Sequence, residues 1–348
     1  MSALSRRRIL FGGAAVGAGA LLTACTSNEP ETNAQVNTNT GTSANPNAAA
    51  GQKVIIGFSA PAADHGWIAA ITTNAKAQAA VYPDVEFRAV ESGTDAAAQR
   101  AAIATLIAQK PTVIVMLPAD GKELDSTGLE AMKAGIPVIN LDRAFPSRAA
   151  YRLQIKGDNY GMGLAAGHYI GEQLKAKGVT NPIIGEIPGI DSLELTQERT
   201  QGFNTALAEY GFKVANRRPA EFTADSGQAA ATALLQALPK MDALWNHDDD
   251  QGIGVLAAIK QTNRSEFFMV GGAGSKLAID AITKDDSVLK ATVTYSPSMA
   301  SSAISLARLI GQGKGMSDLV ELQVPQEITL ASETITKDNA AKYAKLGF

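Results

Sequence analysis

The chain has 348 residues and a formal net charge of −3 at pH 7, with 45% hydrophobic and 19% charged residues. A mildly acidic chain of this kind argues against nucleic-acid binding, which relies on clustered lysine and arginine. The length allows two domains of ordinary size.

The N-terminus carries an export signal. Residues 5–10 read Ser-Arg-Arg-Arg-Ile-Leu, a twin-arginine signature. The apolar run that follows, residues 9–22, is shorter than the roughly 20 residues that a membrane span needs. We therefore predict that residues 1–24 form a cleavable signal peptide. Its removal takes away three arginines and no acid, so the net charge of the mature chain falls from −3 to −6.

The signal is followed by a lipidation candidate and a tether. Leu-Thr-Ala-Cys at residues 22–25 resembles the lipobox of bacterial lipoproteins, and Cys25 is the only cysteine of the chain. This position favours a lipid on Cys25 over an ordinary signal peptide with an incidental cysteine. We expect an exported protein, anchored by lipid to the outer face of the cytoplasmic membrane or periplasmic. Residues 25–52 hold few large apolar side chains, which predicts a disordered tether.

From Lys53 onward, strand and helix patterns alternate. Continuous apolar runs of this kind are typical of parallel strands that are buried on both faces. The first predicted set has strands at 54–58, 85–90, 113–117 and 136–141. Its three predicted helices cover residues 67–81, begin after the capping residue Thr94, and end at residue 132. The second has strands at 151–155, 183–187, 213–222, 243–246, 267–270 and 288–295, and helices at 159–177 and 299–311. This pattern predicts an α/β protein with two Rossmann-like, doubly wound lobes and a cleft between them.

Two segments that directly follow strands combine carboxylate, imidazole and indole groups. They are Asp64-His65-Gly66-Trp67 and the run Trp-Asn-His-Asp-Asp-Asp at residues 245–250. In open α/β sheets, ligands bind outside the carboxyl ends of the strands. Carboxylates that accept hydrogen bonds from hydroxyls, next to an aromatic face, suit a neutral sugar or sugar alcohol. We expect Asp248 to contact the ligand, Asp249 to cap a helix, Asp250 to be solvated or secondary, and Trp245 to belong to the core.

Two other interpretations of these motifs are weaker. The run Gly-Gly-Ala-Gly-Ser-Lys at residues 271–276 lacks the spacer of a phosphate-binding loop and is better explained as a turn into a helix. His247 lies beside three acidic residues, which suggests a metal site, but no recognised metal-loop spacing is present. We therefore expect neither a metal nor a cofactor.

Three strand-end motifs resemble the ribose-binding-protein family of type I periplasmic binding proteins. They are Leu-Asp-Arg at 141–143, Glu-Arg-Thr-Gln-Gly-Phe at 198–203 and Asp-Asp-Asp at 248–250, and the resemblance extends from Lys53 to the C-terminus. It implies two lobes joined by three crossing segments, which close on a sugar by a hinge motion. It also implies lobes built from 53–157 plus 296–325 and from 158–295 plus 326–348. The expected partners are an ABC permease and its ATPase, and a monomer is expected.

The same resemblance assigns ligand contacts to nine residues. Asp142 and Arg143 match the Leu-Asp-Arg pattern, Arg199 matches the arginine of Glu-Arg-x-x-Gly-Phe, and Phe222 matches an aromatic that stacks on the sugar. Five positions differ in type: Trp67 replaces a phenylalanine, Asp64 and His65 replace other polar ligands, Asp248 stands where asparagine is common, and Tyr295 replaces a glutamine.

One departure bears on the identity of the ligand. The family's aspartate after Val-Gly-Phe is Ala273 in this chain. Ribose is therefore not the expected ligand, and a different pentose or a C4–C5 alditol is favoured. Acidic sugars are expected to be repelled by Asp64, Asp142 and Asp248. The alternatives are a membrane-tethered sugar sensor with the same fold and an extracellular glycosidase that uses Asp64 and Asp248. We favour binding without catalysis.

Overall fold

The computed structural model describes residues 47, 49–316, 322–345 and 347–348, all within the compact unit Asn39–Phe348. The predicted signal peptide, Cys25 and most of the predicted tether lie outside the described residues. In the part of the chain that is described, every helix is too short or too polar to span a membrane.

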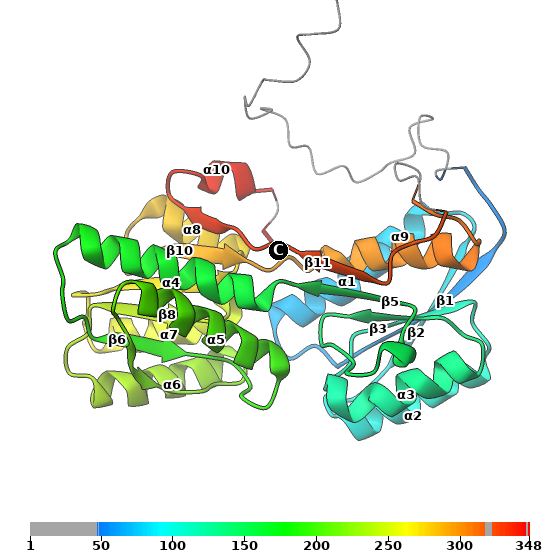
Figure 1. The fold of residues 1–348 in the computed structure, drawn as a ribbon, viewed down its shortest axis with the longest axis horizontal. Helices are drawn as coiled ribbons and strands as arrows, with labels where there is room; N and C mark the ends of the chain where they lie inside the picture. The colour runs from blue at the N-terminus through cyan, green and yellow to red at the C-terminus, as the bar shows by residue number, and fades with distance from the viewer. Residues whose placement is uncertain (1–46, 48, 317–321, 346) are drawn as a thin grey trace, which may run out of the picture. The chain divides into compact units, whose positions relative to one another are not determined.

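Two six-stranded sheets form the framework, and both have the same strand order (Figure 1). The first runs β11-β5-β4-β3-β1-β2, with bounds Glu327–Leu330, Leu153–Gly157, Val138–Leu141, Val113–Met116, Val54–Ala60 and Val85–Glu91. The second runs β12-β10-β9-β8-β6-β7, with bounds Thr334–Thr336, Leu289–Thr294, Phe268–Ala273, Ala243–Asn246, Ile184–Ile187 and Val214–Arg217. The pairing is parallel except between β10 and β12. The order 2-1-3-4-5 in each sheet is a doubly wound one, which confirms the predicted fold class.

Helices cover both faces of each sheet. On the first sheet, α1 (Gly66–Val81) and α9 (Met299–Gly311) lie on one face, and α2 (Ala96–Ala108) and α3 (Gly121–Lys133) on the other (Figure 1). On the second, α4 (Asn159–Ala176) and α5 (Glu194–Glu209) lie opposite α6 (Ala224–Ala237), α7 (Asp249–Gln261) and α8 (Lys276–Lys284). Two short helical elements are η1 (Arg148–Ala150) and α10 (Ala340–Tyr343).

The strand β3 shows why the apolar runs are continuous. Val113 and Val115 face the core that contains α1 and α9, whereas Ile114 and Met116 face the core that contains α2 and α3. Because successive side chains of a strand point to opposite faces, a strand covered by helices on both sides is apolar at most of its positions. The apolar pattern of the sequence therefore identified the strands of the sheet interior.

The chain crosses between the two sheets after β5, after β10 and between β11 and β12. The last crossing corrects the predicted division at residue 326, which placed the following segment in the second lobe. Instead, β11 pairs with β5 in the first sheet, from Glu327 opposite Gln154 to Leu330 opposite Gly157. The side chains of β11 are exposed or half-buried, so this edge strand lacks the apolar pattern of the others.

Two local predictions were also wrong. Asp95, not Thr94, caps α2, because its carboxylate accepts a 2.8 Å hydrogen bond from the backbone N–H of Ala98. The strand predicted to reach Phe222 ends at Arg217. Phe222 has a φ of 63°, which is outside the range of a strand, and directly precedes Thr223, the cap of α6.

The predicted tether does not extend to Gln52. The guanidinium of Arg308 on α9 donates to the carbonyl of Ala49 at 2.7 Å, and the backbone N–H of Gly51 donates to Asp84 at 2.6 Å. Arg308 also forms a buried ion pair with Asp84. Hydrogen bonds attach this segment to the first lobe, so its lack of apolar residues was misleading.

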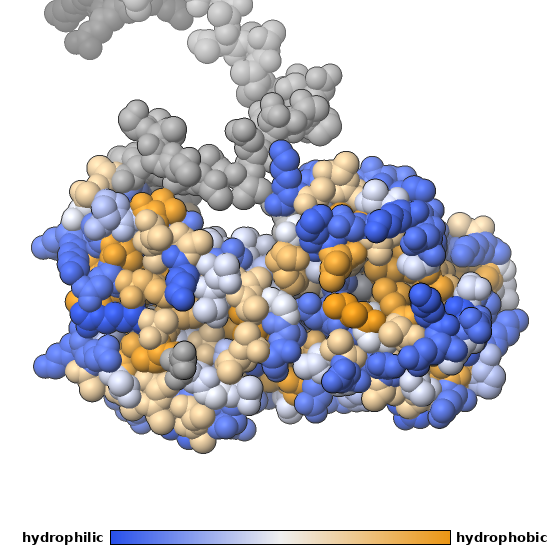
Figure 2. Space-filling model, turned by 180° about the vertical axis from the view of Figure 1, so that it is seen from behind, coloured by the Kyte–Doolittle hydropathy of each residue, from blue (hydrophilic) through white to orange (hydrophobic). Residues whose placement is uncertain are grey.

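The surface of the described residues is mixed in character. Figure 2 shows hydrophilic side chains interspersed with smaller apolar areas on the face that it draws. The large apolar side chains that are exposed lie on separate elements: Val81, Tyr160, Ile253, Leu277 and Leu322.

Candidate ligand-binding site

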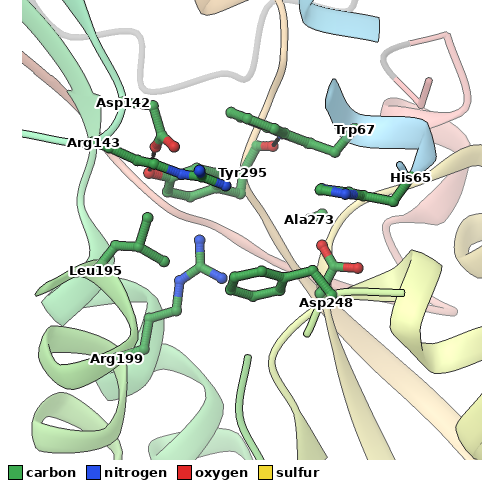
Figure 3. Close-up of a pocket in the computed structure, with 10 residues that line it drawn as sticks. His65, Trp67, Asp142, Arg143, Leu195, Arg199, Asp248, Ala273 and Tyr295 are labelled. Atoms are coloured by element: carbon green, nitrogen blue, oxygen red, sulfur yellow. Dashed lines mark hydrogen bonds between the residues drawn. The ribbon is translucent and has the colours of Figure 1, made fainter. Parts of the chain in front are cut away.

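A small pocket lies where the two lobes meet, and the side chains around it leave a free volume of about 20 Å³. Figure 3 shows side chains of both lobes around the same space. The lining residues are His65, Trp67, Asp142, Arg143, Leu195, Arg199, Phe222, Asp248, Ala273 and Tyr295.

The strand order explains this convergence. The polar and aromatic residues of the pocket follow the carboxyl ends of parallel strands: β1 and β4 in the first lobe, and β6, β7, β8 and β10 in the second. These ends lie at one edge of each sheet, and a doubly wound sheet has its switch point between its first and third strands. Residues far apart in sequence therefore reach the same cavity.

Asp142 and Tyr295 connect the two lobes inside the pocket. Asp142 follows β4 with a φ of 66°, and its buried carboxylate accepts a hydrogen bond from the phenol of Tyr295. Burial, followed by the nearby Asp142 charge, raises the pKa of Tyr295 well above its usual range, so the phenol stays neutral. The Tyr295 carbonyl accepts a 2.9 Å hydrogen bond from the indole of Trp67. Gly157 makes room, since a Cβ there would lie 2.1 Å from the Tyr295 ring.

Two arginines approach the cavity from opposite lobes (Figure 3). Arg199 is 4% exposed, donates to Asn159 at 2.9 Å and to the His247 carbonyl at 3.2 Å, and lies over the Tyr295 ring at 4.5 Å. Arg143 donates to the carbonyl of Ala119. Its buried Nε has no partner among the described residues, and a ligand hydroxyl can supply one.

Acidic groups and an imidazole form the opposite side of the pocket. Asp248 caps α7 by accepting from the Gln251 backbone N–H at 3.0 Å. Burial raises the pKa of Asp248 to about 6, and the nearby His65 works against this rise. His65 contacts Asp64 at 2.5 Å. Burial alone would lower the pKa of His65, but the Asp64 hydrogen bond and the charges of Asp248 and Asp250 outweigh it and raise that pKa.

Eight of the nine predicted contact residues line the pocket. Asp64 does not: its carboxylate turns to His65 and is 46% exposed. Its hydrogen bond to His65 lowers the pKa of Asp64, so it acts on the pocket through the imidazole. Leu195 lines the pocket but was not predicted to do so. It precedes Arg199 by four residues on α5, and this spacing places both residues on one helix face. The spacing from Arg199 could therefore have identified Leu195 as a pocket residue.

The cap of α7 is a different residue of the acidic run from the one predicted. Asp248, expected to contact the ligand, lines the pocket and is also the cap of α7. Asp249, expected to be the cap, is buried and accepts from the backbone N–H groups of Gly272 (2.9 Å) and Ser275 (2.8 Å) and from the Thr292 hydroxyl. Asp250, expected to be solvated or secondary, accepts a 2.8 Å hydrogen bond from the backbone N–H of Trp67 in the other lobe.

The remaining motifs have structural roles. Trp245 is fully buried and packs on Phe203 with ring centroids 4.7 Å apart, as predicted for a core residue. His247 is also buried, and its Nε2 lies 3.0 Å from a carboxylate oxygen of Glu186. The glycine-rich run forms the end of β9 and a turn to Ser275, the cap of α8. Within the described ranges, His, Cys, Asp and Glu side chains form no group of three or more suited to a metal ion.

Comparisons with known proteins identify the family of this chain. Residues 56–315 match the family described as periplasmic binding protein domain. A D-ribose/D-allose-binding protein of Pseudomonas aeruginosa is 26% identical over 249 residues, which cover 70% of this chain and 77% of that protein. A ribose import binding protein of Escherichia coli (strain K12) is 29% identical over 208 residues, 60% of this chain and 68% of the relative.

A solved structure gives the same result for the fold. An ABC transporter solute-binding protein of Mycobacterium smegmatis with bound glycerol superimposes with a TM-score of 0.75 at 25% identity, covering 85% of this chain and 98% of that one. These relatives are binding proteins of transporters, not enzymes. The family match covers most of the chain, the fold agrees over nearly all of it, and the chain therefore belongs to the periplasmic binding protein domain family.

Proposed function

We propose that the chain is the substrate-binding lipoprotein of an ABC importer, which captures a neutral monosaccharide or sugar alcohol by hinge closure and delivers it to a membrane permease. The observation that carries this proposal is the pocket itself. Eight residues predicted from separate parts of the sequence, four from each lobe, line one small cavity. The names of the ribose, D-ribose/D-allose and D-apiose binding relatives support a sugar as the ligand.

The chemistry of the lining supports a polyhydroxylated, uncharged ligand. Trp67, Phe222 and Tyr295 provide aromatic surfaces for C–H groups, and the arginines and aspartates provide charged donors and acceptors for hydroxyls. Hydrogen bonds to charged groups are stronger than neutral ones, and they gain strength where water is excluded. Because two aspartates (Asp142 and Asp248) and two arginines (Arg143 and Arg199) line the cavity, no single sign of charge dominates it.

We propose a pentose other than ribose, or a C4–C5 alditol, as the favoured ligand. Ala273 lines the pocket at the position where the resemblance to ribose-binding proteins implies a ligand aspartate, so one acceptor for a sugar hydroxyl is missing. Asp248, which follows the neighbouring strand β8, supplies a carboxylate to the pocket instead. A flexible, linear polyol can place its hydroxyls to match this changed arrangement.

A thermal-shift screen against pentoses, hexoses, inositols and C4–C6 alditols tests the proposal. A ligand that binds only the folded protein stabilises it by about 2.7 kcal/mol at a concentration of 100 times Kd. We expect at least one neutral pentose or pentitol to raise the melting temperature, with calorimetry confirming that it binds more tightly than ribose. The sugar acid D-gluconate is the control and is expected to give no shift. Tight binding of ribose or gluconate would contradict the proposed ligand class.

We also propose that a lipid on Cys25 anchors the protein to the outer face of the cytoplasmic membrane, where a permease and its ATPase receive the ligand. Cys25→Ala is expected to release the protein from the membrane fraction or to block its maturation. The measurement is mass spectrometry of the mature N-terminus. An unmodified terminus downstream of Cys25 would exclude lipid anchoring while leaving the sugar site unaffected.

A further inference from the structure

The N-terminus of α1 receives its cap from the other lobe. The first N–H groups of a helix lack partners within the helix and need acceptors from elsewhere. His65, the residue at the cap position of α1, makes no side-chain cap bond, and the first turn has no acid, within the described chain. The acceptor is Asp250, at the start of α7 in the second lobe, whose Oδ2 lies 2.8 Å from the backbone nitrogen of Trp67.

The close approach depends on Gly66. A Cβ at that position would lie 2.7 Å from Oδ1 of Asp250 and 3.2 Å from its Cγ. Any side chain at residue 66 would therefore push the carboxylate away from the helix. The φ of Gly66 lies in the range open to all residues, so its backbone does not require glycine. What requires glycine is the Asp250 side chain.

The contact is coupled to the ligand pocket but lies outside it. Asp250 does not line the cavity, whereas the side chain of Trp67 does. The same residue thus offers its indole to the ligand and its backbone N–H to the opposite lobe. The Asp250 charge also acts on His65, another lining residue. A second contact between the lobes, the ion pair of Lys156 with Glu198 at 3.5 Å, is partly exposed and longer.

We propose that Asp250 is a closure residue: it caps α1 only when the lobes meet, and it raises the affinity for the ligand without touching it. This inference rests on the proposed function, because a sugar is what would bring the lobes together. In an open form, water would replace Asp250 as the acceptor for the backbone N–H of Trp67. The ligand favours the closed form by its differential affinity, and the Asp250 bond would add to that preference.

Two variants and one control test the proposal in the full-length protein. Asp250→Ala removes the acceptor, and Gly66→Ala blocks its approach. The control is Asp225→Ala, which removes an exposed acid from the first turn of α6 in the same lobe. Affinity for D-ribose, L-arabinose and ribitol is measured by calorimetry, and the closed fraction by small-angle X-ray scattering with and without sugar.

We expect Asp250→Ala to weaken binding roughly 5- to 30-fold, the effect of losing a helix cap of about 1–2 kcal/mol, and to enlarge the radius of gyration at equal sugar concentration. Gly66→Ala is expected to act in the same direction. Since alanine is a better helix former than glycine, a purely local role of residue 66 predicts no loss of affinity.

The outcomes are distinguishable. If Asp250→Ala and Asp225→Ala have equal affinities and scattering, the closure role is wrong. If Gly66→Ala binds like the parent protein, the close approach has no role in closure, which also overturns the proposal. If none of these three sugars binds the parent, the preference for them fails, but the closure role is still decided. The same comparison of Asp250→Ala with Asp225→Ala is then made with the sugar or sugar alcohol that raises the melting temperature of the parent in the thermal-shift screen, and equal affinities and scattering refute the role.

Discussion

Tyr295 and Asp142 are 153 residues apart in the sequence and share a buried hydrogen bond where the lobes meet. Tyr295 directly follows β10, the last parallel strand of the second sheet, and Asp142 follows β4 of the first. The bond therefore joins the two lobes at the crossing itself, and it fixes the direction in which the Asp142 carboxylate can receive a ligand hydroxyl.

Tyr295→Phe removes the donor and leaves the buried Asp142 carboxylate with one partner fewer. Hydrogen bonds to charged groups contribute about 1.5–3 kcal/mol, so we expect sugar affinity to fall by roughly tenfold or more. Tyr160→Phe, at an exposed position on α4, is the matched control. Calorimetry on both variants is the measurement, and equal affinities would show that the phenol does not position Asp142.

His65 predicts a pH dependence of binding. In this structure its pKa is raised by Asp64, Asp248 and Asp250, despite the lowering effect of burial. When one state of a protein raises the pKa of a group, protonation of that group favours this state. The effect is complete at pH values below the free pKa of the group and is lost as pH rises through the raised pKa. We therefore expect sugar affinity to fall severalfold between pH 6.5 and pH 9. Asp248, with a pKa of about 6, is mostly ionised at the start of this window and becomes fully ionised as pH rises, so it does not account for a loss of affinity near pH 9.

The control for this pH profile is His65→Gln, which keeps a polar side chain but does not titrate. Its affinity is expected to be nearly constant from pH 6.5 to 9. A parent protein whose affinity is equally constant would show that the imidazolium does not contribute to binding.

Asp249 predicts a pH dependence of stability. Burial raises its pKa to about 7 from a reference of 3.8, so the folded state holds a proton that the unfolded state releases. Stability then decreases as pH rises from about 4 to about 7, by on the order of 1.4 kcal/mol per pH unit from this group. The measurement is urea unfolding of the parent and of Asp249→Asn across this range.

Asp249→Asn should also be less stable at low pH, because its amide NH₂ would face the backbone N–H of Gly272 or Ser275. An unsatisfied buried donor costs about 1–3 kcal/mol. The excess stability of the parent is expected to shrink as pH rises. A difference that does not change with pH would mean that the three donors keep Asp249 ionised throughout.

The framework could be predicted because the buried parallel strands are largely apolar on both faces, as Ile114 and Val115 illustrate. The strand ends then located most of the site. What could not be predicted depends on distant partners or on weak patterns. Trp67 and Asp250 are separated by 183 residues, so no local pattern marks Asp250 as a cap. The edge strand β11 carries no continuous apolar run, and its place in the first sheet follows only from its pairing with β5.

The cap of α7 was assigned to Asp249 and not to Asp248 for a related reason. Three consecutive aspartates suit a helix start equally well, and the choice among them is made by tertiary contacts. Asp249 turns toward Gly272 and Ser275 of the neighbouring strand and turn, which leaves Asp248 as the cap. The sequence alone does not show that Gly272 and Ser275 lie next to Asp249.

Ala273 offers the sharpest test of specificity. It ends β9, lines the pocket and has a φ of 101°, a conformation that strains residues other than glycine. Ala273→Asp introduces an acceptor for a sugar hydroxyl while the backbone keeps the strain that it already has with alanine. Ala273→Gly is the control, since it relieves the backbone and adds no acceptor. Both are compared with the parent at pH 8, where a new carboxyl is ionised.

We expect Ala273→Asp to improve ribose binding relative to pentitol binding by roughly tenfold, the effect of one added hydrogen bond to a charged group. A fixed ring presents its hydroxyls in one arrangement, so it gains from an acceptor at a fixed position. A linear polyol must instead adopt that arrangement at a cost in conformational entropy. Ala273→Gly should leave the ratio of the two affinities unchanged. If Ala273→Asp folds and binds with an unchanged ratio, residue 273 does not decide between ring sugars and alditols.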